Sequence, residues 1–243
     1  MKTPAAGAVL PLALLLAGCI DFVELSGPGQ EAEARAIVSV TLLDRPDGVA
    51  PHDSLLVNAE VFPGRDRNGD PRPFQDASLV VGERALPPVR PDDPVLRYEA
   101  GWEVQAGSLA TAPLSVRLPV VRDQQFSPPV LVLSVPVRVG ADTLRLAPGE
   151  PLVIRFRRPA GGDVPSEERW NLLLRRGVGY FSITSIAPLP DSLVVPREWI
   201  PADTATVMEA EIQFERLKYP DSQPNPVAFQ ARMLSTFFVR IDP

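Results

Sequence analysis

Cysteine, histidine and lysine are all scarce in this chain of 243 residues, which has one cysteine and one histidine. Lysine occurs only at Lys2 and Lys218, so arginine supplies nearly all of the positive charge. A lone cysteine excludes an internal disulfide, and any folded region must therefore rest on its own hydrophobic core. Because few side chains remain that serve as nucleophile or base, we expect no enzymatic activity. The net charge of −6 argues against nucleic acid as a partner.

The chain also lacks an apolar run long enough to span a bilayer. The run from Ala5 to Ala17, behind Lys2, is shorter than the roughly 20 residues that a spanning helix needs. A basic start, a short apolar run and small residues at its end are typical of a secretory signal. The run closes with Leu16-Ala17-Gly18-Cys19, which resembles the lipobox of bacterial lipoproteins.

This resemblance implies that residues 1–18 are a signal peptide and that Cys19 carries lipid at the new N-terminus. Two or three acyl chains hold a protein on a membrane, whereas one does so only marginally. Ile20 stands where an aspartate would indicate retention in the inner membrane, so the resemblance favours the outer membrane. Residues 19–35 show no periodicity and are interpreted as a tether. The alternative is an ordinary signal peptide that is cut elsewhere.

Residues 36–158 contain short segments in which apolar side chains recur at every second position, as in half-buried strands. One such segment has Leu55, Val57, Ala59 and Val61 on one face. The same alternation occurs in 36–43, 96–104, 114–120, 131–139 and 152–156. Pro119 and Pro136 interrupt otherwise good strands and therefore predict edge positions, because proline lacks the N–H of a sheet ladder.

Part of this region resembles a bacterial immunoglobulin-like domain. The resemblance rests on Ile37-Val38-Ser39-Val40-Thr41, followed by Val49-Ala50-Pro51-His52-Asp53-Ser54-Leu55, although His52 stands where glycine is usual. It implies a fold and no function. We therefore predict an all-β chain with an immunoglobulin-like antiparallel β-sandwich over 36–158.

A linker is expected over 159–168, followed by a smaller and mainly β module over 169–243. Capping and charge signals favour a short helix over 166–176, while a hairpin that turns at Gly177-Val178-Gly179 is the alternative. Residues 206–219 fit both a strand and a helix. We favour the strand because the neighbouring segments are strands.

Two groups of polar residues raise the question of chemistry. His52, Asp53 and Ser54 include every residue type of a hydrolytic triad, but adjacent residues do not converge on one site. Asp66, Asn68 and Asp70 resemble the start of a calcium-binding loop, with oxygen-bearing side chains two residues apart. The glycine and closing acid of such a loop are absent, so the alternative is a polar turn at Asn68-Gly69.

Exposed aromatic side chains would indicate a binding face, and the sequence offers Trp199 and Tyr219, whereas Trp102 has the parity of a core residue. Several arginines, Arg155, Arg157, Arg158, Arg175 and Arg176, are considered as a basic patch. We predict a lipid-anchored envelope protein that binds other envelope proteins, either as a structural module or as an accessory subunit of an outer-membrane assembly. The alternatives are a glycan- or peptide-binding lipoprotein for nutrient capture and, third, a hydrolase with two convergent carboxylates.

Overall fold

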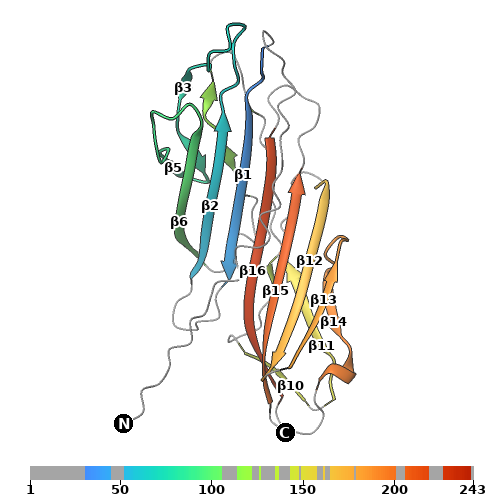
Figure 1. The fold of residues 1–243 in the computed structure, drawn as a ribbon. Helices are drawn as coiled ribbons and strands as arrows, with labels where there is room; N and C mark the ends of the chain where they lie inside the picture. The colour runs from blue at the N-terminus through green and yellow to red at the C-terminus, as the bar shows by residue number, and fades with distance from the viewer. Residues whose placement is uncertain are drawn as a thin grey trace, which may run out of the picture.

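The chain folds into an all-β sandwich that is elongated along its strands (Figure 1). The structure, a computed structural model, describes residues 31–44, 52–105, 114–121, 126, 135–136, 143–147, 149–157, 161, 165–177, 179–200, 206–218 and 227–241. The prediction of an all-β fold is confirmed. Within these residues the helical structure is the 3-10 helix η3 (Arg197–Trp199), and no helix is long and apolar enough to cross a membrane.

The main sheet has eight strands in the order β13-β12-β15-β16-β1-β2-β6, with β10 also beside β16. Their bounds are β1 (Arg35–Asp44), β2 (His52–Phe62), β6 (Leu96–Gln105), β10 (Thr143–Leu146), β12 (Glu167–Arg176), β13 (Gly179–Ser185), β15 (Thr206–Lys218) and β16 (Val227–Ile241). β1 and β10 run parallel to β16, and the other pairs are antiparallel. The main sheet is therefore mixed, where the sequence predicted an antiparallel one.

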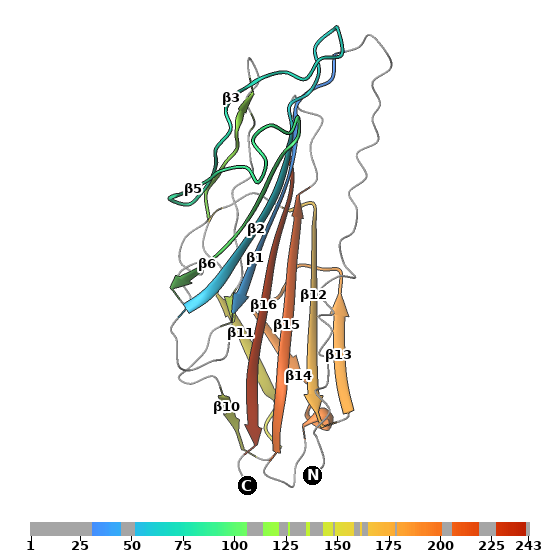
Figure 2. The same cartoon turned by 60° about the vertical axis from the view of Figure 1, so that its left-hand side comes forward.

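Three small sheets, β5-β4-β7, β3-β8 and β14-β11-β9, make the second layer (Figure 2). Their strands are β3 (Phe74–Asp76), β4 (Leu79–Val81), β5 (Arg84–Leu86), β7 (Val116–Arg117), β8 (Val120–Val121), β9 (Val135–Pro136), β11 (Leu152–Arg157) and β14 (Ser192–Val195). Inward side chains of β4, β11 and β14 join those of the main sheet in one hydrophobic cluster. The core is thus the space between the main sheet and the small sheets.

Strict alternation along β1 shows why these residues form strands. Ala36, Val38, Val40 and Leu42 are at most 1% exposed, and the residues between them are half-buried. Val38 lies beside Ala59 of β2 and Phe229 of β16, which continue the same inward face. Burying one such aliphatic side chain stabilises the fold by about 1.5–3 kcal/mol, so a shift of register by one residue would be strongly unfavourable.

The predicted helix over 166–176 is wrong, because residues 167–176 form β12. β12 pairs with β13 on one side and β15 on the other, and Arg176 pairs with Gly179 across the hairpin turn that was the alternative. Gly177 adopts a φ of 53°, which glycine accepts without strain. Two ladders of backbone hydrogen bonds outweigh the weak helix signals of a single segment. The strand favoured for 206–219 is confirmed as β15.

The main sheet draws strands from both regions that the sequence separated. β1 and β10 pair with β16, and β11 pairs with β14, so strands from 36–158 and 169–243 adjoin in two sheets. The strand expected over 114–120 divides at Pro119 into β7 and β8, which join different small sheets. Pro136 lies in β9, an edge strand as predicted.

Candidate functional site

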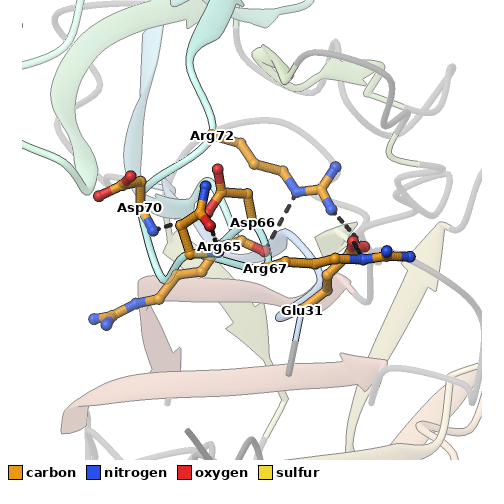
Figure 3. Close-up of polar contacts among 7 residues, drawn as sticks. Glu31, Arg65, Asp66, Arg67, Asp70 and Arg72 are labelled. Atoms are coloured by element: carbon orange, nitrogen blue, oxygen red, sulfur yellow. Dashed lines mark hydrogen bonds and ion pairs between the residues drawn. The ribbon is translucent and has the colours of Figure 1, made fainter. Parts of the chain in front are cut away.

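A loop over 64–72 closes around the first described residues of the chain (Figure 3). Ala32 and Arg65 exchange two backbone hydrogen bonds, at 3.1 and 2.9 Å, and Arg65 also bridges to Pro71. The turn itself is closed by a hydrogen bond from the Gly69 N–H to the Asp66 carbonyl, at 3.0 Å. We call this arrangement of the loop with Glu31 and Ala32 the clasp.

The Asp66 carboxylate faces its own loop. Its Oδ1 accepts hydrogen bonds from the backbone N–H groups of Asn68, at 2.8 Å, and Asp70, at 3.0 Å. This is the Asx-turn geometry that aspartate commonly adopts in loops, and it corresponds to the polar turn that was the alternative to a calcium site. Asn68 and Asp70 are exposed, and no cluster of metal-ligating residues occurs among the residues that the structure describes. The geometry therefore favours a structural role for Asp66.

Glu31 is held by two arginines of the same loop. Arg67 Nε lies 2.9 Å from Glu31 Oε1, and Arg72 donates from Nη2 to Glu31 Oε2 at 3.0 Å. The side chain of Arg72 is only 22% exposed, whereas that of Arg67 is 85% exposed. The partly buried contact with Arg72 is the stronger of the two, because solvent screens an exposed pair to about 0–1 kcal/mol.

Gly64 allows the two backbones of the clasp to meet. Its φ is 73°, and a Cβ atom added there would lie 2.4 Å from the Ala32 carbonyl oxygen and 2.8 Å from the Ala34 nitrogen. Ala34 is fully buried, so residues assigned to the tether by sequence are already packed in the body. The clasp therefore fixes the point where the chain enters β1. Glu31 was missed in the sequence analysis, since only the pairing of Ala32 with Arg65 brings it to this loop.

Of the two aromatic residues proposed for binding, Trp199 is described and Tyr219 lies outside the described residues. Trp199 is 49% exposed and packs on Phe181 of β13, with ring centroids 4.1 Å apart and planes inclined by 32°. This contact links η3 to the edge of the main sheet. Trp102 is half-buried against the core, as its parity indicated, and the Arg84 guanidinium lies 5.2 Å from its ring centroid.

A strongly buried ion pair lies on the inward face of the main sheet. Arg216 Nε lies 2.8 Å from Glu168 Oε1, off the N–H axis, so the contact is an ion pair and not a linear hydrogen bond. The two side chains are 12% and 4% exposed. The other oxygen of Glu168 accepts the Leu189 N–H at 3.0 Å. This pair joins β12, β15 and the segment after β13, and it has a structural role.

Asp44, Asp53 and Ser235 are further polar residues buried on the inward face. The Ser235 hydroxyl donates to the Asp44 carboxylate. Asp53 and Ser54 are neighbours in β2, and successive side chains of a strand point to opposite faces, so the suspected triplet with His52 does not converge. Residue Cys19, with all of 1–30, lies outside the described residues.

Among the arginines considered as a basic patch, Arg155 and Arg157 lie apart from Arg175. Arg155 and Arg157 occupy outward positions of β11 in the second layer, whereas Arg175 lies on the outer face of the main sheet. The outer faces of a two-layer sandwich point in opposite directions. Arg175 is also within 3.8 Å of Glu209 and 3.5 Å of Glu211 on β15. Arg158 lies outside the described residues.

Two titratable groups near β4 have shifted pKa values. Burial raises the pKa of the Tyr98 hydroxyl well above its usual range, and the Asp76 carboxylate adds to the rise. The Tyr98 hydroxyl donates to the Ala77 carbonyl. Hydrogen bonds from the Ser78 N–H and hydroxyl hold the pKa of Asp76 below its usual value. Tyr98 thus joins β6 of the main sheet to the segment before β4, whereas Asp76 stabilises the local turn to Ser78.

Comparison with known proteins adds no assignment. A scan against protein-family models finds no match for the chain, and a search of curated protein sequences finds none either.

Proposed function

We propose that this chain is a non-enzymatic, lipid-anchored protein of the bacterial outer membrane, with Cys19 as its lipidated residue. Its β-sandwich serves as a structural or protein-interaction module, and envelope proteins are its partners. The lipobox supports the anchor, and the scarcity of histidine and lysine supports the lack of catalysis. The clasp is the structural observation that carries the proposal.

The clasp lies close in sequence to the proposed lipid. Glu31 follows Cys19 by twelve residues, and an extended chain spans at most about 3.3–3.6 Å per residue, so the tether reaches roughly 40 Å. A force on the lipid would therefore act on the contacts of Glu31 and Ala32 with the loop over 64–72. A fixed junction of this kind suits a body that is held at one end.

The opposite end of the sandwich is then presented away from the membrane. β1 starts at the clasp, and the β16 strand that runs parallel to it ends at the other end of the molecule (Figure 1). Val227 of β16 pairs with Ala36 at the start of β1. Further along β16, Phe238 pairs with Glu209 of β15, and the same row across the sheet continues to Arg175 of β12 and Tyr180 of β13. Eleven residues at about 3.3 Å each separate these rows by roughly 36 Å. Partners would bind the surfaces of that distal half.

The experiment that tests the anchor is intact-mass analysis of the protein purified from membranes of a bacterium with an outer membrane. We expect a mature chain that begins at Cys19 and carries diacylglycerol with or without an additional acyl chain. The matched variant Cys19→Ala should be unmodified and leave the membrane fraction. An unmodified native chain, or one cut elsewhere, would contradict the proposal.

The interaction role is tested by chemical cross-linking in intact cells, with the native chain compared with Cys19→Ala. We expect one envelope partner to be enriched in proportion to the native chain and to be lost without the anchor. Absence of any enriched partner would refute the accessory-subunit role.

A second candidate function is supported by the exposure of Trp199. An indole that is 49% exposed and packed against Phe181 at an inclination of 32° is a suitable surface for a sugar ring or an apolar peptide side chain. Tryptophan fluorescence titrated with envelope glycans and peptides, compared between the native chain and Trp199→Ala, tests this function. A saturable change lost in Trp199→Ala would favour it over the interaction module.

A further inference from the structure

The main sheet ends on one side at β13, an edge strand on which the described residues place no charge, proline or covering segment of the sheet. β13 pairs with β12 and has no second neighbour in the described sheet. Its seven residues, Gly179 to Ser185, include no charged side chain and no proline, and the uncharged stretch continues to Ala187. Exposed edges of this kind offer unpaired backbone N–H and C=O groups to another strand.

The opposite edge of the same sheet shows what protection looks like. β6 has Arg97, Glu99 and Glu103 exposed at its outward positions, and the Val89 N–H donates to the Arg97 carbonyl. Charges and backbone caps of this kind discourage pairing between sheets. Among the edge strands that the structure describes, β13 is the longest without charge or proline. The contrast within one sheet indicates that β13 is an interaction edge.

Apolar side chains accompany this edge. Tyr180 is 76% exposed, and Ile186, just after the strand, is 72% exposed. Trp199 covers Phe181 and remains half exposed. Large exposed side chains at both ends of a free edge suit a surface that another strand would cover.

We propose that β13 pairs antiparallel with β13 of a second copy of this chain, so that two main sheets join into one across a two-fold axis at Ser182. A strand paired with itself about this axis places Tyr180 opposite Thr184 of the partner subunit. On the inner face it places Phe181 opposite Ile183 of the partner subunit. Both are aromatic–β-branched pairs, which favour cross-strand association, and no like charges face one another.

A second copy of this chain is the partner for which the sequence of β13 is itself complementary. A two-fold interface uses the same patch on both subunits and closes after one contact, so it requires no other protein. The Phe181–Trp199 stack then lies beside Ile183 of the partner subunit and extends the contact from the main sheet to η3. The association does not depend on the lipid, so its failure would leave the proposed anchor unaffected.

Cysteine cross-linking tests the pairing and its register in the full chain carrying Cys19→Ser, in which an introduced cysteine is the sole thiol. Ser182→Cys places two thiols opposite one another, with Cβ atoms about 4.5–5.5 Å apart, and mild oxidation should give a covalent dimer. Thr184→Cys is the register control, because its thiols would be four residues out of alignment, about 14 Å apart. Asn58→Cys, on an exposed position of β2, reports random collision.

Sedimentation velocity over a concentration series measures the association itself. Ser182→Lys sets two like charges opposite one another and should weaken dimerisation by at least about tenfold, whereas Asn58→Lys should leave it unchanged. Circular dichroism checks that both variants fold. A chain that stays monomeric at every concentration would overturn the proposal, and so would equal cross-linking of all three cysteine variants. A β13 that cross-links only to another protein would overturn it too.

Discussion

The buried ion pair between Arg216 and Glu168 leads to a quantitative stability prediction. Arg216→Met removes the guanidinium and keeps much of the apolar length, so the Glu168 carboxylate, 4% exposed, loses this cation. Breaking a buried pair from one side costs about 3–5 kcal/mol. The Coulomb energy of two charges about 4 Å apart at an effective dielectric constant of about 20, roughly 4 kcal/mol, agrees with that range.

The double variant separates the charge from the packing. Glu168→Gln combined with Arg216→Met removes both charges, while the amide oxygen still accepts the Leu189 N–H. Because neither charge is then buried alone, we expect the double variant to lie within about 1 kcal/mol of the native chain. Arg232→Met is the control on the outer face, where the pair with Glu215 is 30% and 20% exposed and should contribute about 1 kcal/mol or less.

Urea unfolding followed by circular dichroism measures these differences in the free energy of unfolding. In thermal scans, Arg216→Met should lower Tm by roughly 2–4 °C per kcal/mol for a chain of this size. A loss below about 1 kcal/mol for Arg216→Met would refute the reasoning, as would a double variant that is as unstable as the single one. Either result would mean that water or another cation neutralises Glu168.

Three further predictions concern other parts of the sandwich. Gly64→Ala should destabilise the chain by about 1–3 kcal/mol or more, because alanine is strained at a φ of 73° and its Cβ would meet the Ala32 carbonyl. Hydrogen exchange should show that the Ala32 N–H loses protection in this variant. Leu172→Ala, at a fully buried position of β12, should cost about 2–5 kcal/mol in urea unfolding. Because the pKa of Asp76 is lowered in the fold, its ionised form stabilises the fold above about pH 4, and this contribution disappears as the pH falls through the folded-state pKa. Asp76→Asn should therefore lose less stability than the native chain on acidification. Urea midpoints measured from pH 6 to about pH 2 check this difference.

Alternation of apolar residues was sufficient to predict most strands, because a half-buried strand leaves its period directly in the sequence. The inward faces of β1, β2 and β11 carry the residues that this period selects. The error at β12 has a clear origin. Trp170, Leu172 and Leu174 do alternate, but Leu173 on the outer face completes a helical stripe, and only the neighbours β13 and β15 decide between the two.

The contacts that define the candidate site were harder to predict, because they join residues far apart in the chain. The Asn68-Gly69 turn has a local signature, and it was the stated alternative to calcium binding. Nothing in the sequence relates Glu31 to Arg72, since their contact depends on the bridge between Ala32 and Arg65. The mixed main sheet was missed for the same reason: the parallel pairing of β1 with β16 leaves no local pattern.

The pairing of β1 with β16 also has a consequence for the order of events during folding. Val227 follows its partner Ala36 by 191 positions, and β16 is the last strand of the described chain as well as the neighbour of β1, β10 and β15. Closing so long a loop is entropically costly, and folds dominated by such contacts form slowly. β1 at the centre of the main sheet therefore gains its β16 neighbour only after all the other described strands have been synthesised, so the middle of the sheet is the part that is completed last.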